Sequence, residues 1–191
     1  MNTVALRSRG AQLTRRSFIQ QSALATAGLA VAAPFVSRAR VLGANDRIGV
    51  GFVGVGGRGR SHVGTVQKLI AAGANLQITA VCDAYKYRLD EAAKVSGGKH
   101  YRKHTELLAD EKVDVVCIAT PDRLHVPQAI DAVRAGKHVY CEKPMGHWTQ
   151  FDLSKLFFEE TRRLKRVVQI GNQGNSNPAW QKVRELVQGG A

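Results

Sequence analysis

Residues 47–59 read Arg-Ile-Gly-Val-Gly-Phe-Val-Gly-Val-Gly-Gly-Arg-Gly (RIGVGFVGVGGRG), and this stretch decides the fold of the 191-residue chain. Its first part, 47–53, is mainly apolar, which predicts a buried strand. The glycines of 54–59 follow the pattern G-x-G-x-x-G, and a helix is predicted over 58–72. A glycine loop that opens a helix offers unpaired backbone N–H groups to an anion. The stretch therefore predicts a phosphate-binding turn.

Strands and helices alternate along the rest of the chain. After the first strand, further strands are predicted at 76–82, 100–101, 113–119, 138–141 and 167–170. The remaining helices are predicted at 85–95, 105–109, 126–135, 152–164 and 178–187. Strand–helix–strand units with right-handed crossovers build a parallel sheet with helices on both faces. The predicted fold class is therefore α/β, a Rossmann-type doubly wound, mainly parallel sheet.

An acidic residue follows the second predicted strand. Asp83 lies 24 residues beyond Gly59. In dinucleotide-binding folds an acid near this distance accepts a hydrogen bond from the adenosine ribose, and its charge repels a 2′-phosphate. NAD is therefore favoured over NADP, although Lys86 and Arg88 weaken that preference. The residues predicted to hold the pyrophosphate are Gly54, Gly56, Gly57, Arg58 and Gly59.

Polar segments follow three further predicted strands. They are Thr120-Pro121-Asp122-Arg123-Leu124-His125, Glu142-Lys143-Pro144 and Gly171-Asn172-Gln173-Gly174-Asn175. Ligands of doubly wound sheets bind beyond the carboxyl ends of the strands. The three segments are therefore expected to border one site.

The segments GVGGRG, VCD, ATPDRLH and CEKP, with the Gln/Asn-rich turn, resemble the glucose–fructose oxidoreductase / inositol dehydrogenase (Gfo/Idh/MocA) family. The resemblance covers about residues 47–191. It implies an NAD-dependent oxidoreductase that transfers hydride between a sugar or polyol and the nicotinamide. It also implies a second α/β substrate domain, which we expect to be absent from this chain. Residues 45–175 are then the NAD-binding domain, and 176–191 a helix leading toward the missing domain.

The resemblance assigns a catalytic position to Lys143. A lysine there would polarise or help to deprotonate the substrate hydroxyl as hydride leaves, provided that burial lowers its pKa. Glu142 would contact the nicotinamide ribose, and the family pattern implies a cis peptide before Pro144.

The resemblance also places Thr120, Pro121 and His125 along the cofactor cleft, and Gln173 beside the cofactor or substrate. From the residues alone, His125 could instead cap or pack a helix, and Gln173 could be a turn residue. The three cysteines are expected to be buried apolar groups, and no metal site is predicted.

The basic balance of the chain has a local explanation. The chain carries 28 Lys+Arg against 15 Asp+Glu, a net charge of +13, which by itself suggests nucleic acid or an anionic membrane. Residues 1–44 hold six arginines and no acid, which leaves +7 on the rest. Arg15-Arg16, followed by Ser17-Phe18-Ile19, resembles a twin-arginine export signal. We therefore predict no nucleic-acid partner.

An apolar run follows the paired arginines. A helix over Ala23–Val36 would be about 21 Å long, short of the roughly 30 Å hydrocarbon core of a bilayer. The run therefore predicts a signal peptide rather than a stable membrane span. Residues 1–44 are expected to be signal and linker, with the twin-arginine export machinery as a partner and a periplasmic or other extracytoplasmic location.

Alternative functions remain open at this point. Some exported relatives of the family resemble NAD-dependent glycoside hydrolases, which oxidise a sugar transiently, eliminate the leaving group and then reduce the product. A truncated, non-catalytic NAD-binding module is another alternative. Homo-oligomer formation is left open for a full-length form.

Overall fold

The computed structural model describes residues 47–190, so the predicted signal and linker at 1–44 lie outside the described residues and stay a prediction. A parallel sheet in the order β3-β2-β1-β4-β5-β6 forms the centre of the domain. The strands are β1 (Ile48–Val53), β2 (Leu76–Cys82), β3 (Lys99–Tyr101), β4 (Val115–Ile118), β5 (His138–Glu142) and β6 (Val168–Gly171). The order reverses between β1 and β4, which confirms the doubly wound fold.

The helices follow the predicted pattern, with two 3₁₀ turns added. They are α2 (Gly57–Ala71), α3 (Lys86–Ser96), α4 (His104–Leu108), α5 (His125–Arg134), α6 (Phe151–Arg163) and α7 (Pro178–Gln188). The turns η1 (Asp122–Leu124) and η2 (Gln173–Ser176), which the sequence did not predict, follow β4 and β6. Within 47–190, none of the helices is both long and apolar enough to cross a membrane.

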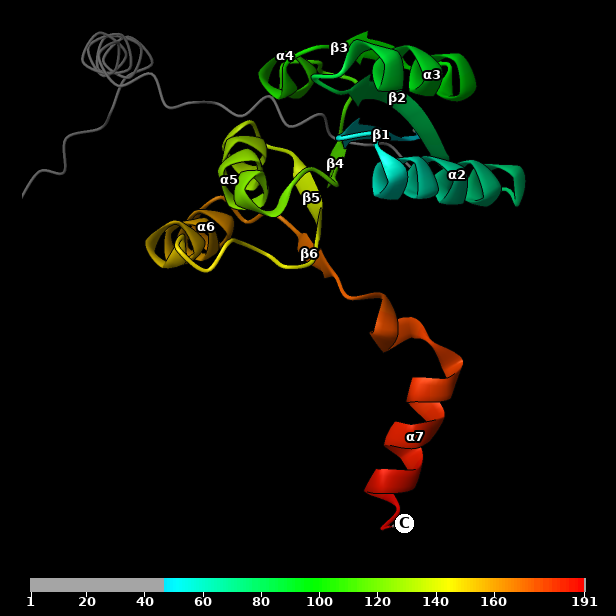
Figure 1. Ribbon diagram of the computed structural model, residues 1–191, viewed down its shortest axis with the longest axis vertical. Coiled ribbons are helices and arrows are strands. Elements are labelled where there is room, and N and C mark those ends of the chain that lie inside the picture. Colours follow the sequence, from blue (N-terminus) through cyan, green and yellow to red (C-terminus); the bar gives the residue numbers. More distant parts are fainter. Residues whose placement is uncertain (1–46, 191) are drawn as a thin grey trace, which may run out of the picture. The chain divides into compact units, whose positions relative to one another are not determined.

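Side chains of the strands alternate between two apolar cores, one on each face of the sheet. Phe52 belongs to the core that contains Val63 of α2 and Leu89 of α3. The next residue, Val53, belongs to the other core, which contains Phe157 of α6. Figure 1 shows α5 and α6 on one side of the strands and α2 on the other. The alternation follows from successive Cβ atoms of a strand pointing to opposite faces.

The fourth strand is shorter than the predicted 113–119, because a side chain replaces part of the backbone ladder. The Asp114 carboxylate Oδ2 accepts from the Gly49 backbone N–H at 2.7 Å. The Asp114 N–H in turn donates to the Gly49 carbonyl at 2.8 Å. A Cβ at Gly49 would lie 1.8 Å from the carbonyl oxygen of Lys112, so this approach requires glycine.

All three cysteines of the chain, Cys82, Cys117 and Cys141, are free and buried, as predicted. Burial is the main cause that raises the pKa of each thiol to about 12. Thiols with so high a pKa are protonated at neutral pH and act as small apolar groups of the sheet.

Candidate functional site

The loop between β1 and α2 adopts a conformation that needs glycine. Gly54 has a φ of 83°, and a Cβ there would lie 2.7 Å from the carbonyl oxygen of Ala119. A Cβ at Gly59 would lie 1.8 Å from the carbonyl oxygen of Gly54. The tight turn and the close helix–strand packing expected of the glycine pattern are both present. At Gly57, by contrast, a Cβ would meet nothing within 4 Å.

The start of α2 is suited to an anion. Within Gly57–Ala71 the first turn contains no acidic residue, and the N-cap Gly56 provides no side-chain cap. The first N–H groups of a helix have no partner inside the helix, and the helix dipole places partial positive charge there. Backbone geometry and charge at this turn therefore fit a pyrophosphate.

Asp83 fastens the end of β2 to the glycine loop. Its Oδ2 accepts from the Val55 N–H at 2.9 Å, and its Oδ1 accepts from the Tyr85 N–H at 2.8 Å. An ionised carboxylate has about four acceptor positions, so each oxygen can still accept from a ribose hydroxyl. Asp83 therefore lies where the sequence predicts the ribose acceptor.

A cavity of about 560 Å³ opens beside Asp83. Gly54, Gly56, Pro121 and Arg88 are among its lining residues. The guanidinium Nη1 of Arg88 would lie 3.1 Å from a Cβ at Gly56, and its Cζ is 5.6 Å from the centre of the Tyr85 ring. The cationic side chain of Arg88 therefore lies beside the glycine loop, as does the anionic side chain of Asp83.

A second cavity, of about 420 Å³, opens at the other half of the same sheet edge. It is lined by Arg58, Ala119, Thr120, Asp122, His125, Glu142, Lys143 and Gln173. Ala119 and Thr120, after β4, line both cavities. Of the predicted site residues, Gly57 and Gly59 line neither cavity; the structure brings the others together along this edge.

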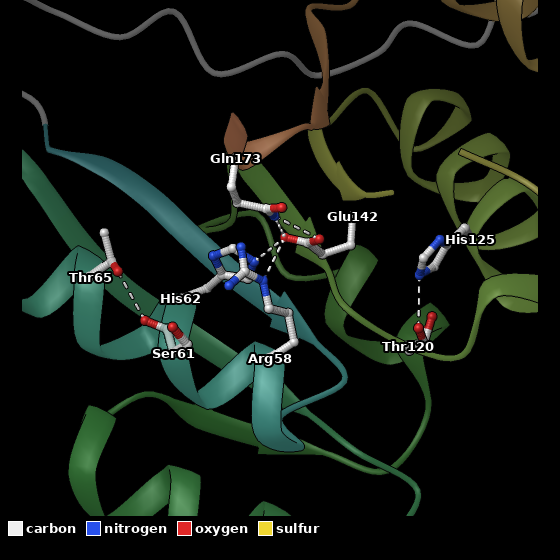
Figure 2. Close-up of polar contacts among 8 residues, drawn as sticks. All are labelled: Arg58, Ser61, His62, Thr65, Thr120, His125, Glu142 and Gln173. Carbon is white, nitrogen blue, oxygen red and sulfur yellow. Dashed lines mark hydrogen bonds and ion pairs between the residues drawn. The ribbon is translucent and has the colours of Figure 1, made fainter. Parts of the chain in front are cut away.

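The carboxylate of Glu142 collects hydrogen bonds in the second cavity (Figure 2). Its Oε1 accepts from Arg58 Nε at 2.9 Å and contacts His62 Nε2 at 2.7 Å. Gln173 Nε2 donates to Oε1 at 2.6 Å and to Oε2 at 2.8 Å. The residue is only 5% exposed. Burial alone would raise the pKa of Glu142, but the hydrogen bonds from Gln173, Arg58 and His62 outweigh it and hold the pKa below its usual value.

His62 is the member of this cluster that the sequence did not predict. It lies four residues after Arg58 on α2, a spacing that puts both side chains on one face of the helix. That spacing is the available signal, and it does not identify the partner. Glu142 lies 80 residues away along the chain, and only the fold brings it to His62.

His125 braces two loops. It is 1% exposed, with Nδ1 2.7 Å from the carbonyl oxygen of Pro144 and Nε2 2.8 Å from that of Thr120. Both ring nitrogens thus face backbone oxygens, which matches the packing alternative even though the residue borders the cavity. These contacts hold the segment that contains Lys143, whose peptide bond to Pro144 is cis as expected. Lys143 itself is exposed and lines the second cavity.

Comparisons with known proteins agree with this geometry. Residues 48–172 match the oxidoreductase family GFO_IDH_MocA, described as having an NAD-binding Rossmann fold. An inositol 2-dehydrogenase of Rubrobacter xylanophilus is 32% identical over 150 residues, which cover 78% of this chain and 42% of that protein. A glycosyl hydrolase family 109 protein of Shewanella baltica is 32% identical over 157 residues, covering 69% and 33%.

Solved structures show the same fold. The WlbA dehydrogenase of Chromobacterium violaceum, in complex with NADH and UDP-GlcNAcA, superposes with a TM-score of 0.69 at 27% identity. The match covers 74% of this chain and 40% of that one. The chain thus spans less than half the length of the relatives it matches.

The close approach at Gly59 is testable by a pair of variants. We predict that Gly59→Ala lowers the free energy of unfolding by at least about 2 kcal/mol, because the new methyl group would overlap a backbone oxygen. Gly57→Ala, two residues earlier, should change it by less than about 0.5 kcal/mol. Urea denaturation of both variants measures the difference, and equal effects would contradict the packing described.

The charge of Glu142 gives a pH-dependent prediction. A carboxyl whose pKa is lowered in the folded protein stabilises the fold above the usual pKa, and this contribution is lost as the pH falls. Unmodified protein should therefore exceed Glu142→Gln in stability by roughly 2 kcal/mol at neutral pH. The difference should shrink as the pH falls below about 4.5, the ordinary value. Denaturation curves measured at intervals of about one pH unit between pH 3 and pH 7 would show this decrease. A stability difference that stays constant over this range would contradict the prediction.

Proposed function

Because the chain belongs to the GFO_IDH_MocA oxidoreductase family, we propose that it is the nucleotide-binding part of an NAD-dependent oxidoreductase that acts on a polyol or sugar. One observation carries the proposal. Two cavities meet at the carboxyl end of β4, with Asp83 in one and both Glu142 and Lys143 in the other. This arrangement supplies separate chemistry for the two ends of one dinucleotide.

Different residues of the site would bind different parts of the cofactor. The glycine turn at 54–59 and the first N–H groups of α2 suit the pyrophosphate, and Arg58 adds a charge there. Asp83 accepts from the hydroxyls of the adenosine ribose, and Glu142 from those of the nicotinamide ribose. When bound, NAD supplies the hydride acceptor, while these side chains bind and orient it.

Lys143 would assist the removal of the substrate hydroxyl proton. It directly follows Glu142, and its exposed side chain lies at the cavity assigned to the nicotinamide end. Nζ can accept the substrate hydroxyl proton when it is neutral, or donate a hydrogen bond to the developing alkoxide when it is charged. Either role requires that the substrate hydroxyl lie beside the nicotinamide.

The relatives support the substrate class and a second candidate. The similarity to inositol 2-dehydrogenases favours a polyol, and that to glycosyl hydrolase family 109 proteins favours an NAD-dependent glycosidase. Both reactions can begin with hydride transfer to NAD⁺. Incubation of the protein with NAD⁺ and a panel of inositols and glycosides distinguishes the two reactions. Net NADH formation from inositols favours the dehydrogenase, and glycoside cleavage without it favours the glycosidase.

Binding of the cofactor tests the proposal independently of turnover. We predict that the chain binds NAD⁺ at least about tenfold more tightly than NADP⁺, because the Asp83 carboxylate repels a 2′-phosphate. Asp83→Asn removes that charge and should narrow the difference several-fold. Isothermal titration calorimetry gives both dissociation constants. Glu91→Gln, at a surface ion pair with Lys94 on α3, is the matched control and should leave them unchanged.

Failure to bind NAD⁺ at millimolar concentration would overturn the proposed function. Equal or tighter binding of NADP⁺ would overturn the role given to Asp83, and would point instead to Arg88 beside the loop.

A further inference from the structure

The two oxygens of Glu142 are used unequally. Oε1 is contacted by three nitrogens, Arg58 Nε at 2.9 Å, His62 Nε2 at 2.7 Å and Gln173 Nε2 at 2.6 Å. Among the described residues, Oε2 receives only Gln173 Nε2, at 2.8 Å. A carboxylate oxygen has about two lone-pair positions, so Oε1 is saturated. Oε2 is the oxygen that can accept from a further hydroxyl.

His62 and Arg58 are different kinds of partner for Oε1. The His62 side chain is 15% exposed, and its ring packs edge-on against Tyr140 with centroids 5.2 Å apart. The Arg58 side chain is 44% exposed and lies in the first turn of α2. A pyrophosphate bound at that turn would compete for the Arg58 guanidinium, which pairs strongly with phosphate. The His62 imidazole lies outside the residues assigned to the pyrophosphate, so we expect its contact with Glu142 to persist when phosphate is bound.

We propose that His62 is a positioning residue, which keeps Oε1 of Glu142 turned toward α2 so that Oε2 is left for a hydroxyl of the nicotinamide ribose. The proposal rests on the proposed function, because that ribose belongs to the dinucleotide. Figure 2 shows the arrangement, with His62 and Arg58 reaching Glu142 from α2 and Gln173 reaching it from another segment. Two elements thus restrain the rotation of one carboxylate.

The chemistry of the contact defines the variants. An ionised carboxylate only accepts, so Nε2 of His62 must carry the proton. Gln can place an amide nitrogen at a similar reach from the backbone as Nε2. Asn is one carbon shorter and does not reach, and Leu has no donor. Thr65→Val is the matched control, because Thr65 lies on the same helix and is exposed, and within residues 47–190 its hydroxyl donates only to the Ser61 carbonyl, at 3.0 Å.

The experiment compares NAD⁺ with ADP as ligands of the full 191-residue chain. ADP retains the adenosine and pyrophosphate but lacks the nicotinamide ribose. We expect His62→Leu to weaken NAD⁺ binding by about tenfold and ADP binding by less than about twofold, as for loss of one hydrogen bond to a charged group. His62→Gln should restore most of the NAD⁺ affinity, and Thr65→Val should match the unmodified chain.

A second comparison covers the case in which His62→Leu does not fold. The polar pair His62→Asn and His62→Gln then carries the test, with weak NAD⁺ binding expected for Asn and nearly normal binding for Gln. In a Glu142→Gln background, His62→Leu or His62→Asn should change NAD⁺ affinity by less than about twofold, because the effect passes through the carboxylate.

Three results would overturn the proposal. Equal losses of NAD⁺ and ADP affinity would mean that His62 only supports the fold. Unchanged NAD⁺ affinity in His62→Leu or His62→Asn would mean that it has no role in binding, while the proposed function would stand. An unmodified chain that binds ADP but not NAD⁺ would overturn the proposed function itself, and the role of His62 with it.

Discussion

A carboxylate that is buried at the end of a strand needs hydrogen-bond donors around it, because burial of an unpaired charge costs roughly several kcal/mol. Glu142 is compensated by donors from α2 and from η2, so β5 is linked to the helix that follows the glycine turn. Glu142 lines the second cavity, and α2 begins at the glycine turn that borders the first. Both the placement of the nicotinamide end and the conformation of the phosphate turn depend on where α2 lies.

The glycines determine how α2 reaches that place. Since Gly59 has no side chain, the helix starts directly against the carbonyl of Gly54, and its first turn stays next to the end of β1. His62 lies just beyond that turn and meets Glu142. One helix therefore offers backbone N–H groups to a phosphate and an imidazole to the carboxylate. A displacement of α2 would disturb both halves of the site together.

Much of this arrangement could be predicted from the sequence, because it depends on local pattern. Apolar runs and the glycine motif located the strands and the turn, and Asp83 followed from its distance to that turn. Family resemblance supplied Glu142 and Lys143 at the end of β5. The shortened β4 was missed, because an Asp114 side chain that replaces a ladder hydrogen bond looks like any polar residue near a strand.

The contacts of His62 and His125 could not be predicted, because they form across long separations. His62 meets a partner 80 residues away, and His125 spans the carbonyls of Thr120 and Pro144. Nothing in the local pattern of α2 distinguishes a histidine that faces a buried carboxylate from one that faces solvent. Such contacts depend on the strand order, which places β5 within reach of the first helix.

A crystal structure of the chain with NAD⁺ bound tests the central claim most directly. The account predicts that the dinucleotide spans both cavities, with its pyrophosphate at residues 54–59 and a nicotinamide-ribose hydroxyl hydrogen-bonded to Oε2 of Glu142. His62 should remain on Oε1. A nicotinamide ribose that lies away from Glu142, or a Glu142 carboxylate that has left His62 to reach the ribose, would contradict it.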